Sequence, residues 1–253
     1  MPIIKVNNSN VHIQELNKTA KETVILIHGM FSNLSVYYFN IAPILAKSFR
    51  VVLYDLKSHG LTQRVPGGYD LASMTEDLVQ LMKKLNLREV YLAGYSFGGL
   101  IALNTAINYP ELIKKLVIIE APDPSDNRTA AIIDQYDKDF LEHYVANFAD
   151  PAQPQMSKRQ LEKNHQMYDY LFQQTSIKTD MLLERDFFRK AKLHELALPV
   201  LLLYATDSVC LDAGKELRSK ILKTKLMELN GDHNLPVQDP LTTGKMMEIF
   251  FRD

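Results

Sequence analysis

The chain has 253 residues, of which 46% are hydrophobic, and this is enough apolar material for one ordinary domain that carries an insertion. Its 29 Lys and Arg residues nearly balance 30 Asp and Glu residues, so the formal net charge of −1 argues against a nucleic-acid partner. The single cysteine, Cys210, excludes an internal disulfide and a cysteine-rich metal site. Because the sequence also lacks an apolar run of about 20 residues, we expect a cytoplasmic protein without integral membrane association.

Short apolar runs rich in Val, Ile and Leu alternate with longer segments of helical period. This alternation is typical of the α/β class, in which a mostly parallel sheet is covered by helices on both faces. Two weaker runs at the start of the chain predict an antiparallel edge. In chain order, the eight predicted strands cover residues 3–6, 11–16, 24–27, 51–54, 90–93, 116–119, 200–204 and 225–229.

Three segments show the 3.6-residue period of an amphipathic helix. In the first, apolar residues recur on one face at positions 78–85, and Ser73 and Glu76 have the spacing of a capping box ahead of them. The other two predicted helices cover residues 100–108 and 242–251.

Residues 122–196 break this alternation, because they contain helical periods and no convincing strand. They predict a helical cap inserted into a core formed by residues 1–121 and 197–253. Most of the large apolar side chains of the cap should form its own packing core. These side chains are Tyr136, Phe140, Tyr144, Phe148, Met156, Met167, Tyr168, Tyr170, Phe172, Phe187 and Phe188.

The strongest local motif is Gly-Tyr-Ser-Phe-Gly-Gly at residues 94–99. It follows a predicted strand directly and precedes a predicted helix, which is the context that a G-x-S-x-G nucleophile elbow requires. Small residues two positions before and two positions after Ser96 permit a strained turn that exposes its hydroxyl above the sheet, at the positive end of the helix dipole. The motif therefore predicts Ser96 as a nucleophile.

A serine hydroxyl is a weak nucleophile unless a base accepts its proton. Among the seven histidines, His233 is the best candidate, because it lies between the last predicted strand and the last predicted helix, C-terminal to the serine. Attack on a carbonyl also creates an oxyanion that needs two backbone N–H donors. We expect one from Phe97 and the other from Met30, in the loop after the strand at 24–27, where Gly29 lets the backbone approach.

These residues resemble the α/β-hydrolase superfamily across essentially the whole chain. The loop at residues 55–62, with the sequence Asp-Leu-Lys-Ser-His-Gly-Leu-Thr, is similar to the D-x-R-N-H-G-x-S loop of the small bacterial YbfF-like esterase and acyl-thioesterase group. Lys57, Ser58 and Thr62 are conservative departures from that pattern. The resemblance implies an eight-stranded α/β-hydrolase fold with a helical cap and a Ser-His-acid triad.

Most members of the superfamily have the triad acid in a G-x-x-D turn after the penultimate predicted strand. In this chain Ser208 stands at that position and Asp207 stands one residue early, an offset that tends to aim the side chain away from the histidine. The resembled group also uses an acid at the end of the strand that follows the nucleophile helix, where Glu120 ends an apolar run. A carboxylate there needs a partner, and His233 would supply it. We therefore predict Glu120 as the acid, with Asp207 as the alternative.

Together these residues predict a serine hydrolase that cleaves a carboxylic ester or acyl thioester through an acyl-Ser96 intermediate. The aromatic content of residues 122–196 favours a small-molecule substrate with a hydrophobic acyl group. Because side chains and backbone perform this chemistry, no metal or organic cofactor is expected. Two alternatives stay open: a lyase or C–C bond hydrolase on the same triad, and a ligand sensor that retains the triad.

Overall fold

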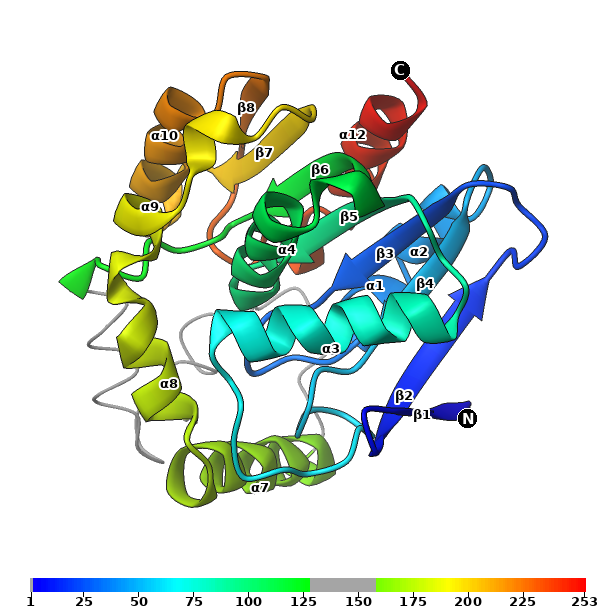
Figure 1. Ribbon diagram of the computed structural model, residues 1–253, viewed down its shortest axis with the longest axis vertical. Coiled ribbons are helices and arrows are strands. Elements are labelled where there is room, and N and C mark those ends of the chain that lie inside the picture. Colours follow the sequence, from blue (N-terminus) through cyan, green and yellow to red (C-terminus); the bar gives the residue numbers. More distant parts are fainter. Residues whose placement is uncertain (1, 128–157) are drawn as a thin grey trace.

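The computed structural model describes residues 2–127 and 158–253, and its centre is an eight-stranded sheet (Figure 1). The strands follow the order β1-β2-β4-β3-β5-β6-β7-β8, with β3 to β8 parallel and β2 antiparallel to both β1 and β4. The predicted sheet and its antiparallel edge are therefore confirmed. The strands are β1 (Ile3–Val6), β2 (Ser9–Leu16), β3 (Thr23–Ile27), β4 (Arg50–Tyr54), β5 (Val90–Tyr95), β6 (Ile113–Ile119), β7 (Val200–Ala205) and β8 (Thr224–Leu229).

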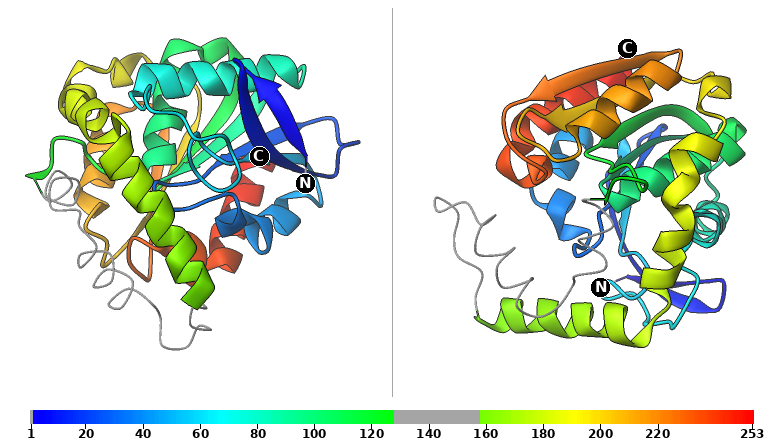
Figure 2. Two further views of the ribbon diagram at one scale, coloured as in Figure 1. Left: turned by 90° about the horizontal axis from the view of Figure 1, so that it is seen from below. Right: turned by 90° about the vertical axis from the view of Figure 1, so that its left-hand side faces the viewer.

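Helices cover both faces of this sheet (Figure 2). The α-helices of the described core are α1 (Ser35–Tyr38), α2 (Ile41–Leu45), α3 (Leu71–Lys84), α4 (Phe97–Asn108), α10 (Leu211–Lys220), α11 (Leu235–Gln238) and α12 (Pro240–Arg252), and η1 (Pro110–Leu112) is a 3₁₀ turn. Side chains of α3, α4 and α10 join one hydrophobic core, and those of α1, α2 and α12 join the other.

The continuous apolar strands fill both cores because successive strand side chains point to opposite faces of the sheet. In β3, Ile25 and Ile27 enter the core beside α3 and α4, whereas Val24 and Leu26 enter the core beside α2 and α12. Strand β8 is covered less completely than the inner strands, although Leu226 packs against one core and Met227 and Leu229 pack against the other. It forms the edge of the sheet, so its side chains are exposed or half-buried.

The helix α3 begins at Leu71 and is capped by Asp70, not by Ser73. The Asp70 carboxylate accepts a hydrogen bond from the Ser73 N–H at 2.8 Å and another from its hydroxyl at 2.7 Å. The predicted capping box at Ser73 and Glu76 is therefore wrong, because an acidic acceptor in extended backbone lies three residues earlier. The other two predicted helices are confirmed, and each begins a few residues earlier than expected.

The region predicted as a cap contains helices and no strand in its described part. These elements are α7 (Lys158–Gln174), α8 (Ile177–Leu183), η2 (Glu184–Asp186), α9 (Phe187–Lys190) and η3 (Leu193–Glu195). In Figure 1, α7 and α8 lie at the opposite end of the molecule from α12. The limits of the cap stay a prediction, and Tyr136, Phe140, Tyr144, Phe148 and Met156 lie outside the described residues.

Helix α7 contacts the core through the loop that follows β3. The Tyr168 hydroxyl donates a hydrogen bond to the Phe31 carbonyl at 2.8 Å, and the Phe31 ring packs against the rings of Tyr168 and Phe172. Among the described residues, no helix is long and apolar enough to cross a membrane.

Candidate active site

Ser96 occupies the sharp turn between β5 and α4, with φ at 53° and ψ at −121°. A positive φ is uncommon for a residue other than glycine, and it marks a strained backbone that the surrounding structure must hold. The flanking glycines are required by close backbone contacts. A Cβ at Gly94 would lie 2.1 Å from the Gly98 carbonyl oxygen, and one at Gly98 would lie 2.5 Å from the Ile27 carbonyl oxygen. The predicted elbow is therefore present, with Ser96 half-buried at the carboxyl end of the sheet.

His233 lies in the loop between β8 and α11, with its imidazole beside Ser96. The distance from His233 Nε2 to Ser96 Oγ is 3.1 Å, which is within hydrogen-bond reach. Tyr95 holds this loop, because its hydroxyl donates to the His233 carbonyl at 3.0 Å and its ring packs against the imidazole. Ser96 and His233 are thus brought together at the carboxyl end of the sheet, although β6 and β7 lie between the strands that precede them.

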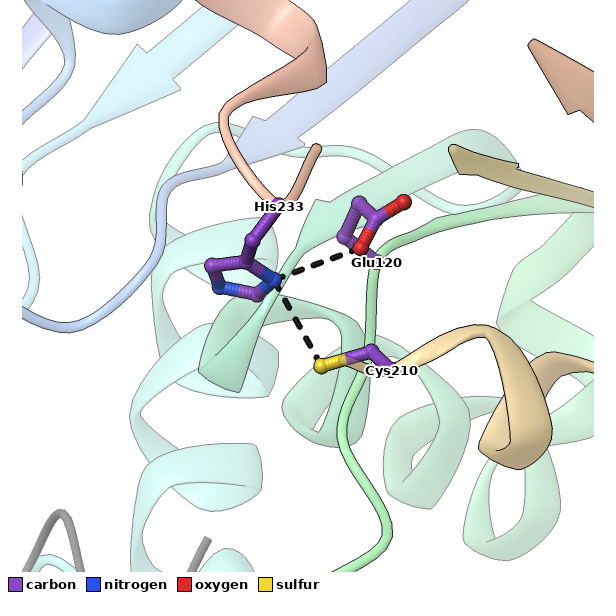
Figure 3. Close-up of side chains that lie close together, drawn as sticks. All are labelled: Glu120, Cys210 and His233. Atoms are coloured by element: carbon purple, nitrogen blue, oxygen red, sulfur yellow. Dashed lines mark hydrogen bonds and ion pairs between the residues drawn. The ribbon is translucent and has the colours of Figure 1, made fainter. Parts of the chain in front are cut away.

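Glu120 follows the last residue of β6, and its side chain is completely buried. Its Oε2 lies 3.3 Å from His233 Nδ1 (Figure 3), whereas Ser96 Oγ lies beside the other ring nitrogen, Nε2. The Ala205 N–H donates to Oε1 at 2.5 Å, and the Ser208 hydroxyl donates to Oε2. These contacts satisfy a carboxylate that would otherwise be costly to bury.

Asp207, the alternative acid, is exposed. Among the described residues it makes no side-chain contact with His233, and its N–H donates to the Gly231 carbonyl at 3.0 Å. The geometry thus joins Ser96, His233 and Glu120 and leaves Asp207 outside. Ser208 stands at the position where the sequence pattern expects an acid, and it contributes a hydroxyl donor to Glu120 instead.

Cys210 is a neighbour of His233 that sequence reasoning missed. Its Sγ lies 3.5 Å from His233 Nδ1, and its donor atom, with those of Glu120 and His233, forms a set that could hold a metal ion (Figure 3). Burial lowers the pKa of the His233 imidazole, but the contacts with Cys210 and Glu120 raise it, and the net shift is upward from 6.5. No local motif marks Cys210, because the contact depends on how the loop after β7 packs.

The predicted oxyanion donor Phe97 directly follows Ser96 as the first residue of α4, and the predicted donor Met30 lies in the loop that follows β3. A Cβ at Gly29 would lie 3.0 Å from the Ser96 Cβ, so the absence of a side chain lets this loop approach the nucleophile. Among the described residues, neither the Met30 N–H nor the Phe97 N–H has a hydrogen-bond partner. Both groups are therefore available to a substrate oxygen.

His28 orients the peptide group that contains the Met30 N–H. Its Nδ1 is 2.7 Å from the Gly29 carbonyl, and its Nε2 accepts from the Leu56 N–H at 2.9 Å, so its proton resides on Nδ1. Burial lowers the pKa of this imidazole, which favours the neutral form. The Gly29 carbonyl and the Met30 N–H belong to one planar trans peptide and point in opposite directions. The hydrogen bond to the carbonyl therefore directs the Met30 N–H away from His28.

The Asp55 loop, on which the sequence resemblance partly rests, is a scaffold for this region. The Asp55 carboxylate accepts hydrogen bonds from the Leu34 and Leu61 N–H groups at 2.8 and 2.9 Å, and it contacts His12 Nδ1 at 2.8 Å. Gly60 has φ at 52°, and a Cβ there would lie 2.0 Å from Asp55 Oδ2, so only glycine fits. The loop thus ties strand β2 to the segment that follows Met30.

Comparisons with known proteins agree with this architecture. A family model described as the alpha/beta hydrolase fold matches residues 22–163, more than half of the chain. The protein named "Putative carbamate hydrolase RutD" of Pantoea ananatis is 27% identical over 237 residues, which cover 87% of this chain and 85% of that protein. Ethanol acetyltransferase 1 of Eremothecium cymbalariae is 37% identical over 101 residues, and this alignment covers 39% of this chain and 28% of that protein.

A solved structure is similar over nearly the whole chain. The meta-cleavage product hydrolase of Pseudomonas fluorescens IP01 superposes with a TM-score of 0.80, covering 100% of this chain and 97% of that chain at 18% identity. At this identity the likeness concerns the fold alone.

Proposed function

Because the chain belongs to the alpha/beta hydrolase family, we propose that it is a serine hydrolase that cleaves a carboxylic ester or acyl thioester. The observation that carries this proposal is the line of contacts from Ser96 Oγ through His233 to Glu120, with distances of 3.1 and 3.3 Å. A nucleophile, a base and an orienting acid in this arrangement are what acyl transfer through an acyl-serine requires.

In this mechanism His233 Nε2 accepts the hydroxyl proton of Ser96 as Oγ attacks the substrate carbonyl. Glu120 accepts the hydrogen bond from Nδ1–H and stabilises the imidazolium that forms. The N–H groups of Met30 and Phe97 donate to the oxyanion. The imidazolium then protonates the leaving alcohol or thiol, and a water deprotonated by His233 releases the acid from Ser96.

The described part of α7 supports a hydrophobic acyl group. Phe31 directly follows the proposed donor Met30, and its ring contacts Tyr168 and Phe172. Phe31 is half-buried, and Tyr168 and Phe172 are buried behind it, so an apolar ring with apolar packing follows the proposed donor and favours an alkyl or aryl chain.

The same triad could break other bonds, and the relatives indicate which ones to test. RutD is named for carbamate hydrolysis, ethanol acetyltransferase 1 for acetyl transfer, and the Pseudomonas enzyme for hydrolysis of a meta-cleavage product. C–C bond hydrolysis is the second candidate, because a Ser-His-Glu arrangement defines the nucleophile and its base but not the bond that is broken.

The decisive experiment is a substrate panel with acyl chains of increasing length. Oxygen esters and thioesters of each acyl group are compared with carbamates and vinylogous diketones. We expect repeated turnover of an ester or thioester, and an acyl adduct on Ser96 in the intact mass spectrum. Faster cleavage of the diketones would favour the second candidate. Labelling of Ser96 by a fluorophosphonate without repeated turnover would favour a ligand sensor.

The oxyanion assignment predicts an asymmetric response to substitutions at Met30. Met30→Pro removes the backbone donor and should lower kcat by about 10²- to 10³-fold, the usual loss for one missing donor. Met30→Ala is the matched control, because it retains the N–H and should be partly tolerated. Steady-state kinetics on variants with native circular dichroism test this. A folded Met30→Pro protein with full kcat would show that Met30 is not a donor.

The environment of His233 predicts the pH dependence of the reaction. Only the neutral imidazole accepts the Ser96 proton, and the neighbours of His233 raise its pKa above 6.5. We therefore expect kcat/KM to rise with pH through a midpoint above 6.5. In Glu120→Gln the anionic neighbour is lost, so this midpoint should move to lower pH. A wild-type midpoint at or below 6.5 in the measured pH profile would contradict the described environment.

A further inference from the structure

Three metal-binding donor atoms lie together around Nδ1 of His233 (Figure 3), the ring nitrogen that is not in contact with Ser96. His233 Nδ1 is 3.3 Å from Glu120 Oε2 and 3.5 Å from Cys210 Sγ, and all three donor atoms lie within 4.8 Å of one another. Glu120 directly follows β6, Cys210 precedes the first residue of α10, and His233 lies in the loop after β8 that Tyr95 holds through the His233 carbonyl.

These distances suit a tetrahedral metal site. Zinc bonds of about 2.0–2.1 Å to nitrogen or oxygen and about 2.3 Å to sulfur correspond to ligand separations of about 3.3 Å for N···O and about 3.6 Å for N···S. The two separations measured from His233 Nδ1 match these values. Thiolate and imidazole ligands select borderline and soft ions such as Zn²⁺ and Cd²⁺, and not Mg²⁺ or Ca²⁺.

We propose that Glu120, Cys210 and His233 form an inhibitory site for Zn²⁺ or Cd²⁺, built into the catalytic machinery. The inhibitory effect rests on the proposed function, whereas metal binding does not. The side chain of His233 is 20% exposed, Cys210 is 7% exposed and Glu120 is fully buried, so an ion has to enter past His233. The Cys210 N–H donates to Ser208 Oγ at 3.0 Å, which fixes the backbone that carries the sulfur.

The inhibition follows from the tautomer of His233. A neutral imidazole bound to a metal through Nδ1 carries its proton on Nε2. That N–H then faces Ser96 Oγ as a donor and cannot accept the hydroxyl proton. The ion also binds the Glu120 carboxylate, which then no longer accepts a hydrogen bond from His233 Nδ1. One binding event therefore removes both the proton acceptor for Ser96 and the acid that orients His233.

The protons and charges of this binding step balance. When the ion binds the neutral imidazole, the Nδ1 proton is exchanged through solvent for one on Nε2, and the Cys210 thiol releases one proton. The two positive charges of the ion are then offset by the Glu120 carboxylate and the Cys210 thiolate. No oxidant or further reactant is needed.

Metal binding is tested first on Ser96→Ala, which retains all three ligands and is independent of turnover. Because Cys210 is the only cysteine in the chain, an ultraviolet sulfur-to-cadmium charge-transfer band reports on that residue alone. We expect the band to saturate at one Cd²⁺ per chain. Cys210→Ala should abolish it, and Glu120→Gln should weaken binding. Asp207→Asn, a nearby exposed acid outside the cluster, is the matched control and should bind normally.

Inhibition is tested on the wild-type protein, with ester turnover measured against Zn²⁺ concentration and reversed by a chelator. In Cys210→Ala the Zn²⁺ concentration for half-inhibition should rise at least about tenfold, since even outer-shell partners contribute 10- to 100-fold to metal affinity. Each variant is compared with its own rate without metal. Equal inhibition of wild type and Cys210→Ala, or no charge-transfer band at saturating Cd²⁺, would overturn the site. A normal band in a chain that hydrolyses no substrate would support the site and count against the proposed function.

Discussion

Replacing Ser96 by alanine is expected to abolish acyl transfer while the fold stays intact. Ser96 Oγ lies 3.1 Å from His233 Nε2. It is the only non-hydrogen atom that the substitution removes, so little packing is lost. Loss of the nucleophile in a triad lowers kcat by about 10⁶-fold in a well-studied serine protease, and a comparable loss is expected here. The measurement is kcat for the best ester of the panel, with circular dichroism and thermal unfolding as checks on the fold.

The same argument extends to His233, because the nucleophile and the base act as one unit. His233→Ala should lose about as much activity as Ser96→Ala, and the double variant should be no slower than either single variant. A fluorophosphonate should label the wild-type protein and should not label Ser96→Ala. Wild-type turnover in a clean Ser96→Ala preparation, or a double variant far slower than both single variants, would refute the pairing.

The Glu120→Gln substitution is expected to lower kcat by a factor on the order of 10² to 10⁴. This range is taken by analogy with other triads in which the acid was replaced by its amide. The glutamine keeps the size of the side chain but can present an N–H where the carboxylate accepts the His233 Nδ1 proton. That would favour the proton on Nε2, the wrong tautomer for accepting a proton from Ser96. The loss should appear in kcat, because substrate contacts are unchanged.

Asp207→Asn is the matched control for this prediction. The Asp207 side chain is exposed and outside the triad geometry, so its amide should have nearly normal kcat. Glu120 is buried, so the Gln variant must also be shown to fold by thermal unfolding. A large loss in Asp207→Asn together with near-normal activity in Glu120→Gln would assign the acid to Asp207.

The amino-acid sequence by itself determined the sheet, its antiparallel edge and the elbow. These are local properties: apolar runs such as Val24 to Ile27 make strands wherever both faces are covered, and the glycines around Ser96 permit a turn that other residues would block. Family resemblance and chain order also directed attention to His233 and Glu120, whose roles stay predictions.

The tertiary structure decided what depends on neighbours far away in sequence. Only the packing of the β6, β7 and β8 ends brings Glu120 to His233, turns Ser208 into a donor to Glu120 and puts Cys210 beside the imidazole. The N-terminal cap residue of helix α3 also depended on context, because Asp70 supplies the acceptor. The side chains of β8 are partly exposed because this strand lies at the edge of the sheet. Sequence spacing describes one segment at a time, whereas contacts between side chains depend on strand order and on backbone angles such as the φ of 54° at Glu120.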